Sequence, residues 1–285
     1  MIANPGDAQA ALYLSEQRIM YIGRLAPNLS LATAASILVV SLEQPIGIEL
    51  GQDGRISRYT SLLIPAATQV RLHTSQALVA LCYLDILGRD LAIIKPRMAR
   101  NLTLANSQQL YAEIDNEAGI ITSASHLYEF SSPAEFAFMQ LDSWIGNPPA
   151  KSNAPYDPRV EKVLDLIKSS ILENRPVQTI ANELNLSVPR LSQIFKKVTG
   201  IPMRRYRLWQ RIFITAVKMA WGMSLTEASI SSGFSDSAHF SRVFKEITGV
   251  KPSAVLHSKS ATLILMLPPM QEIQSRRLQH QPANA

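Results

Sequence analysis

Short apolar runs separated by turn signals dominate the first half of the chain. Residues 36–42 read SILVVSL, a β-branched run typical of a strand, and residues 51–54 (GQDG) are typical of a hairpin turn. Signals of this kind predict strands at residues 36–42, 46–50, 61–64, 70–73 and 77–84. Short strands at this spacing are typical of a β-sandwich or a small barrel.

The apolar period then changes to that of a helix. Residues 133–145 are predicted to form a helix that leads into residues 147–158, NPPAKSNAPYDP, where four prolines prevent a helix or a central strand. Residues 159–172 resume the helical period. We therefore predict an α+β protein of two domains, a β domain at 1–146 and a helical domain at 159–258, joined by a linker at 147–158.

A repeat occupies most of the helical half. Residues 186–200 recur at 234–249, and from Leu191 onward the offset is 49 residues. Apolar residues recur at positions i, i+3, i+4 and i+7 of each copy, which predicts the buried stripe of one helix. The matched residues are Leu191, Ile194, Phe195 and Val198 in the first copy and Phe240, Val243, Phe244 and Ile247 in the second.

Each copy is preceded by a shorter predicted helix, at 178–184 and at 225–232. Asn185 and Gly233 stand between the two helices and tolerate the left-handed backbone that a tight turn needs. Ser187 and Ser235 are the predicted N-caps. Two helices joined in this way predict helix-turn-helix motifs at about 177–198 and 225–248, with the second helix of each as the recognition helix.

The residues opposite the buried stripes are the candidates for contact with DNA. Gln193 and Arg242 occupy equivalent outward positions, and these side chains can pair with adenine and guanine in the major groove. Lysines toward the helix ends suit phosphate contacts. The candidates are Pro189, Arg190, Ser192, Gln193, Lys196 and Lys197 in the first copy, and Ser237, Ala238, His239, Ser241, Arg242 and Lys245 in the second.

A third predicted helix, at 203–220, separates the two motifs. At 1.5 Å per residue it spans roughly 27 Å, close to the ~34 Å of one duplex turn, so it could hold two recognition helices in successive major grooves. Arg204, Arg205, Arg207 and Arg211 are expected to add positive charge to its first turns. The alternative is a helical bundle whose repeat is purely structural.

Charge divides the 285 residues in the same way. Residues 1–150 carry 9 Lys and Arg against 13 Asp and Glu, a net of −4, whereas residues 151–285 carry 19 against 9, a net of +10. The basic half suits a polyanion, although a solvated basic surface is the alternative. A single cysteine and the lack of a long apolar run or a secretion signal favour the cytosol over a membrane or secreted location.

The repeat resembles the AraC/XylS family of bacterial transcription regulators. Residues 224–245, SLTEASISSGFSDSAHFSRVFK, followed by TGVKPS, match the family signature nearly residue for residue, and residues 184–202 resemble its first motif. Asn185, Ser229 and Leu256–His257 depart from the usual residues. The resemblance implies a seven-helix domain with two helix-turn-helix motifs, and promoter double-stranded DNA and RNA polymerase as partners.

The first half loosely resembles the cupin-like sensor domains of that family, which implies a small-molecule effector of unknown identity or dimer formation. Residues 133–145 are the candidate segment for a homodimer. His73 is the only histidine among the predicted strands and the paired histidines of many cupins are missing, so neither a metal nor another cofactor is expected.

An enzyme and a nonspecific DNA binder are the alternatives to a regulator. An enzyme built on a catalytic cupin needs a metal cluster or an activated nucleophile, and neither pattern occurs, so catalysis is not expected. A nonspecific architectural DNA binder is the other alternative. In the C-terminal tail at 259–285, residues 261–267 are expected to pack on the DNA-binding domain as a strand or helix, or else to be a partner site, and 271–285 to be disordered.

Overall fold

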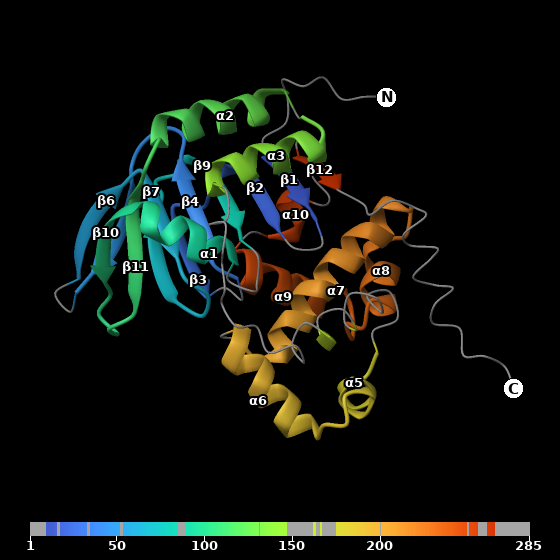
Figure 1. The fold of residues 1–285 in the computed structure, drawn as a ribbon. Coiled ribbons are helices and arrows are strands. Elements are labelled where there is room, and N and C mark those ends of the chain that lie inside the picture. Colours follow the sequence, from blue (N-terminus) through green and yellow to red (C-terminus); the bar gives the residue numbers. More distant parts are fainter. Residues whose placement is uncertain are drawn as a thin grey trace, which may run out of the picture. The chain divides into compact units, whose positions relative to one another are not determined.

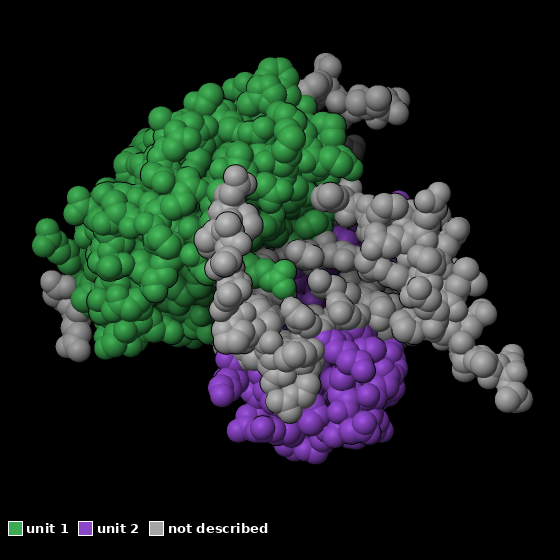
Figure 2. Space-filling model, in the orientation of Figure 1, with its two compact units in different colours: residues 1–153, 238–265 green, residues 154–237, 266–285 purple. Residues whose placement is uncertain are grey.

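The structure is a computed structural model, and it describes residues 10–15, 18–32, 35–51, 54–84, 89–130, 132–146, 162–163, 166, 175–199, 201–249, 251–255 and 261–265. The chain divides into two units, which Figure 2 colours separately. The first unit comprises residues 1–153 and 238–265, and the second comprises residues 154–237 and 266–285. The predicted linker at 147–158 and the predicted disordered tail at 271–285 lie outside the described residues.

Eight strands form the larger sheet of the first unit (Figure 1). They are Ala10–Leu14 (β1), Ile19–Arg24 (β2), Ile37–Ser41 (β4), Ser61–Ile64 (β7), Leu78–Tyr83 (β9), Met98–Thr103 (β10), Gln109–Ile114 (β11) and Ala261–Leu265 (β12). Their spatial order is β10-β11-β7-β4-β9-β2-β1-β12, and the pair of β1 and β12 is parallel whereas the other pairs are antiparallel. All residues of β1, β4 and β7 are buried, so both faces of this sheet are covered.

A second sheet has the order β3-β8-β5-β6. Its strands are Asn28–Ala32 (β3), Ile46–Leu50 (β5), Arg55–Tyr59 (β6) and Gln69–His73 (β8). Val70 and Leu72 of β8 are buried whereas Gln69 and Arg71 are exposed, so one face packs inward and the other faces solvent. A single parallel bridge between Gly51, which follows β5, and Leu104, which follows β10, links the two sheets.

Helices cover the outer face of the larger sheet (Figure 1). They are Arg89–Ile94 (α1), the short 3-10 helix Lys95–Arg97 (η2), Glu117–Phe130 (α2) and Ala134–Ile145 (α3). Leu127 of α2 and Leu141 and Trp144 of α3 join one buried cluster with Tyr13 and Leu38 of the sheet. The predicted strands are confirmed as β4, β5, β7, β8 and β9, and the predicted helix at 133–145 is confirmed as α3.

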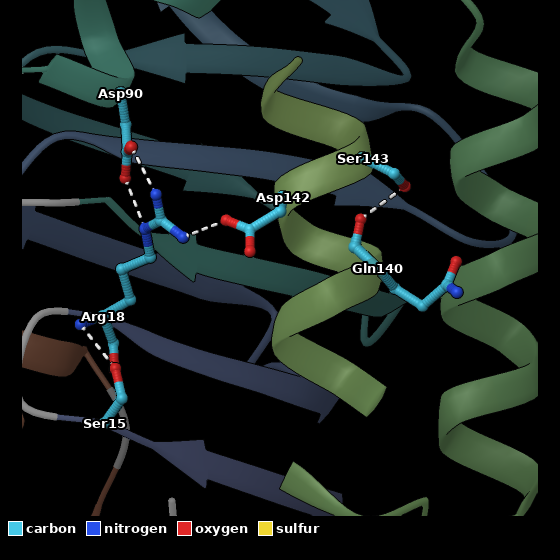
Figure 3. A network of polar contacts seen from close by, with 6 residues as sticks. All are labelled: Ser15, Arg18, Asp90, Gln140, Asp142 and Ser143. Atoms are coloured by element: carbon cyan, nitrogen blue, oxygen red, sulfur yellow. Dashed lines mark hydrogen bonds and ion pairs between the residues drawn. The ribbon is translucent and has the colours of Figure 1, made fainter. Parts of the chain in front are cut away.

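A polar network ties the turn between β1 and β2 to α1 and α3 (Figure 3). The guanidinium of Arg18 donates to both carboxylate oxygens of Asp90, from Nε at 2.7 Å and from Nη2 at 2.6 Å, and it also bonds Asp142. Burial alone would lower the pKa of Arg18, but the bonds to the two carboxylates outweigh burial and raise it. Arg18 therefore stays charged and anchors α3 to the sheet.

Helices make up the described part of the second unit. They are Val177–Glu183 (α5), Val188–Thr199 (α6), Met203–Ala220 (α7) and Leu225–Ser231 (α8). Of the helix predicted at 159–172, the structure describes only Lys162, Val163 and Leu166, which are helical. Ser237–Thr248 (α9), apart from its first residue, and Pro252–Val255 (α10) belong with β12 to the first unit. None of the described helices is long and apolar enough to cross a bilayer.

Candidate nucleic-acid interface

The first helix-turn-helix motif turns at Asn185. Its φ is 53°, the left-handed conformation that asparagine tolerates better than most residues, which confirms the prediction for this position. The Leu186 amide donates to the Ala181 carbonyl at 2.9 Å, and the Asn185 amide donates to the Asn182 carbonyl at 3.0 Å. These bonds satisfy carbonyls at the end of α5 and fix the angle at which α6 leaves the turn.

The predicted cap of α6 is present, and so is the predicted buried stripe apart from Val198, whose side chain lies outside the described residues. Ser187 precedes the helix, and its Oγ accepts a hydrogen bond from the Arg190 amide at 3.4 Å. Leu191, Ile194 and Phe195 are buried. The Phe195 ring lies 5.5 Å from the Tyr206 ring of α7, so the apolar face of α6 packs against the connecting helix.

The opposite face of α6 is polar and open to solvent. Its exposed residues are Pro189, Arg190, Gln193, Lys196 and Lys197, and Ser192 is partly exposed. One contact orders this face, because the Arg190 Nη1 donates to the Gln193 Oε1 at 2.7 Å. The side chain predicted to read a base is thus held by a neighbouring cation on the same helix.

The connecting helix α7 has the predicted bounds, Met203–Ala220. Of the arginines expected to add positive charge to its first turns, Arg204 is exposed whereas Arg205, Arg207 and Arg211 are half-buried. The Arg207 Nη2 donates to the Arg175 carbonyl at 2.6 Å, a contact within the fold. Burial lowers the pKa of Arg207, with a further contribution from the charge of Arg211, and burial also lowers the pKa of Arg211.

The second motif begins with a capping box on α8. The Ser224 Oγ accepts from the Glu227 amide at 3.2 Å, and the Glu227 carboxylate accepts from the Ser224 amide at 3.0 Å. The bonds from Ser224 lower the pKa of Glu227. The turn follows at Gly233, whose φ of 91° confirms the predicted left-handed position, and the Phe234 amide donates to the Ser229 carbonyl as Leu186 does to Ala181.

Helix α9 carries the second predicted stripe. Phe240, Val243, Phe244 and Ile247 are buried, and the Phe240 and Phe244 rings lie 5.5 Å apart. Ala238, Arg242 and Lys245 are exposed, and Ser237, His239 and Ser241 are partly exposed. Ser235 was the predicted cap, but the helix starts at Ser237, so Asp236 holds the position that Ser187 holds in the first copy. An aspartate caps as well as a serine, and the offset of 49 residues would have indicated it.

A metal site and a reactive cysteine are the other kinds of site that bear on function. Among the residues that the structure describes, no group of three or more His, Cys, Asp or Glu side chains gathers as metal ligands. Cys82 is buried, and burial raises the pKa of its thiol. Helices α6 and α9 each carry an exposed polar face opposite a buried apolar stripe.

Part of the chain that contains these motifs is similar to known proteins. Residues 180–258 match a family described as a helix-turn-helix domain. The chain is 33% identical over 101 residues to the arabinose operon regulatory protein of Escherichia coli (strain K12), a match that covers 35% of each chain. It is 36% identical over 104 residues to the Msm operon regulatory protein of Streptococcus mutans, covering 36% of this chain and 37% of that protein. Over this region the chain is therefore similar to these regulators and carries the helix-turn-helix domain of the matched family.

These matches cover only about a third of the length of each of those relatives. The solved structure of ToxT from Vibrio cholerae O395 is similar over 84% of this chain and 96% of that one, at 17% identity and a TM-score of 0.48. Both operon regulators are named for control of an operon, and neither name describes an enzyme.

Proposed function

We propose that the chain is a sequence-specific transcription regulator that inserts α6 and α9 into successive major grooves on one face of promoter DNA. The observation that carries this proposal is the repeated orientation of one outward side chain. Gln193 and Arg242 are both exposed, 49 residues apart, on helices whose opposite faces are buried. A structural repeat alone would not require polar, outward residues at equivalent positions.

The two outward side chains differ in the base they suit. The amide of Gln193 can donate to N7 and accept from N6 of adenine, and the guanidinium of Arg242 can donate to both O6 and N7 of guanine. Pro189 and Ala238 offer no hydrogen bond, so base contact falls to Gln193, Ser192, Arg242 and His239. Arg190, Lys196, Lys197 and Lys245, with Ser237 and Ser241, are proposed to contact the DNA backbone.

The connecting helix supports a two-groove geometry. Helix α7 has 18 residues, and at 1.5 Å per residue it is roughly 27 Å long. One side of α7 is buried, and packing against that side supports the helix. The buried residues include Met203, Tyr206, Trp209 and Phe213. A braced helix of this length suits recognition helices that are separated by one turn of duplex, about 34 Å.

The first domain is proposed to regulate binding. The proposal divides the chain into a sensor at 1–146, a linker at 147–158, a DNA-binding domain at 159–258 and a tail at 259–285. A small-molecule effector could act on DNA binding only by binding two states of the sensor with different affinity. RNA polymerase as a partner and a cytoplasmic location follow from the family resemblance.

A homodimer through α2 and α3 is part of the proposal. The exposed fraction is 59% for Phe130, 36% for Phe136 and 55% for Met139, an unusual density of large apolar side chains at a solvent surface. The His126 ring lies 4.6 Å from the Phe130 ring and extends the surface. We expect Phe136→Ser with Met139→Ser to shift sedimentation toward the monomer, and an unchanged dimer would contradict this interface.

Base reading by Arg242 is the direct test of the proposed function. The probes are a duplex selected from a random library by the full chain and a random duplex of equal length. We expect Arg242→Ala to weaken binding to the selected duplex by about 1–3 kcal/mol and to relax preference at one base pair. The control Lys245→Ala should weaken both duplexes alike and lower the salt slope by about one.

The same titrations separate the alternative functions. Equal losses for Arg242→Ala on the selected and random duplexes would contradict base reading and favour an architectural binder. A specific reader should prefer its own site by at least about a thousandfold. Stoichiometric metal in the purified protein would instead favour a catalytic sensor domain.

A further inference from the structure

The C-terminal strand β12 completes the sheet of the sensor. It pairs with β1 in parallel over five residues, from Ala10 with Ala261 to Leu14 with Leu265. The sequence suggested that this segment packs on the DNA-binding domain, but its strand partner is β1. All five residues of β1 are buried. Without β12, β1 would be the last strand of the sheet, an apolar edge that proteins rarely leave open.

The connection between these two strands contains the whole DNA-binding domain. A parallel pair needs a crossover, and here the crossover runs from β1 through every other element to β12. Pairing of β12 therefore does more than add a strand, because it joins residues that follow the DNA-binding domain to the sheet of the sensor.

The end of α9 is held at the same sensor. The Tyr83 hydroxyl of β9 donates to the Thr248 carbonyl in the last turn of α9, and both residues are buried. Gly249 follows with a φ of 70°, and a side chain at that position would collide with Leu31 and Leu29 of β3. Helix α10 then packs against both β1 and β12. The end of α9, helix α10 and strand β12 are thus each attached to the sensor.

This attachment has a consequence for DNA binding. From Ala238 onward, α9 groups with the sensor, whereas α6, α7 and α8 group together in the other unit. Two-groove reading needs α6 and α9 to be held at one fixed spacing. We propose that β12 is a latch, which holds the end of α9 on the sensor when it is paired with β1 and opposes DNA binding until it is released.

Coupling of this kind is reciprocal. If the paired latch weakens DNA binding by some factor, bound DNA weakens the pairing by the same factor. The proposal rests on the proposed function, because the affinity that the latch controls is that of the two recognition helices. Its structural part, the hold of β12 on α9, does not need DNA and can be tested alone.

The structural part is tested by hydrogen exchange of the full chain carrying Thr262→Pro and Leu263→Pro. Backbone amides alternate between the two sides of a strand, so one of the two prolines must disrupt pairing with β1. We expect faster exchange at β1 and at Glu246–Gly249. The matched control is Gln271→Pro with Glu272→Pro, which should leave exchange at Glu246–Gly249 unchanged. Equal exchange there in the strand variant and the control would overturn the latch.

The regulatory part is tested by a reversible lock. Ala11→Cys with Thr262→Cys places two cysteines at paired positions of β1 and β12, within the Cα separation that a disulfide accepts. The oxidised chain should bind the selected duplex about 5-fold to 150-fold more weakly than the reduced chain, the usual range of coupling between two sites. The single variant Ala11→Cys should show no such dependence on oxidation.

The outcomes distinguish the two proposals. If the lock forms and the affinity for the selected duplex does not change, the latch is wrong while sequence-specific reading stands. If neither the locked nor the reduced chain prefers the selected duplex to a random one, the proposed function is wrong, and the hydrogen-exchange result alone decides whether β12 holds α9. A lock that strengthens binding would also overturn the latch.

Discussion

At the scale of single residues, the exposed face of α6 is organised around one contact. The Arg190 guanidinium donates to the side-chain amide oxygen (Oε1) of Gln193 at 2.7 Å, three residues along the same helix. This bond fixes the amide so that its NH2 group points away from Arg190. A glutamine that is oriented before it meets DNA loses less side-chain freedom on binding.

Replacement of Arg190 tests this positioning. We expect Arg190→Lys to keep the charge and the salt dependence of binding, but to weaken the base preference set by Gln193 by about 1 kcal/mol, because lysine lacks the planar fork of arginine. Binding to a library of single-base variants measures it. Lys197→Ala is the control, and it should lower the salt slope without changing base preference. An Arg190→Lys chain with unaltered base preference would rule out a positioning role.

At the scale of elements, the turns fix how each recognition helix is presented. Asn185 takes a φ of 53° and Gly233 a φ of 91°. In each turn, the backbone amide of the next residue donates to the carbonyl of the residue five positions before it, in the preceding helix. The second motif adds a capping box between Ser224 and Glu227, which the first motif lacks at Pro176. The turn of the first motif therefore depends more on the backbone of Asn185.

Substitutions at Asn185 should reveal that dependence. Asn185→Val should lower the free energy of local unfolding of α5 and α6 by about 1–2 kcal/mol, because a β-branched residue disfavours the left-handed conformation. Asn185→Gly should leave it near the original value. Hydrogen exchange of the α5 and α6 amides gives the opening free energy, and Asn182→Val, at an exposed helical position, is the control. Equal effects at the two positions would contradict a special role for the turn.

The helices were predicted more completely than the strands. Helix α7 kept its bounds because its apolar period is long and Pro202 stands directly before it. Strands β1 and β2 were missed because they are buried on both faces and show no alternation, and the loosened pattern after residue 105 hid β11 and α2. The pairing of β12 with β1 could not be predicted, since partners about 250 residues apart leave no local signal.

The candidate site was predicted well where it depends on helical period. Gln193 and Arg242 are exposed because they lie opposite buried stripes that the sequence displays. The partial burial of the arginines of α7 could not be predicted because it depends on tertiary contacts, such as that of Arg207 with the Arg175 carbonyl. The hold of Tyr83 on Thr248 has no signal in the sequence for the same reason.

At the scale of the whole molecule, charge and function are divided along the chain. Residues 1–150 carry a net charge of −4 and residues 151–285 a net charge of +10. An acidic domain attached to a basic one lowers the overall attraction to a polyanion and leaves it concentrated on one part of the chain. Removing the acidic part should therefore favour DNA binding on electrostatic grounds alone.

A fragment of residues 159–258 tests this division. We expect it to bind the selected duplex at low salt at least as tightly as the full chain, because it keeps both motifs and loses the acidic domain. Residues 1–146 should not bind either duplex, and they serve as the control. A fragment that is helical by circular dichroism but does not bind would contradict a self-sufficient DNA-binding domain.

The most direct measurement is a scan of every base pair of the selected duplex against the full chain, Gln193→Ala and Arg242→Ala. Two recognition helices in successive grooves predict two blocks of base preference with centres about 10–10.5 base pairs apart. Gln193→Ala should flatten one block and Arg242→Ala the other. A single block, or two substitutions that flatten the same positions, would contradict reading by two helices.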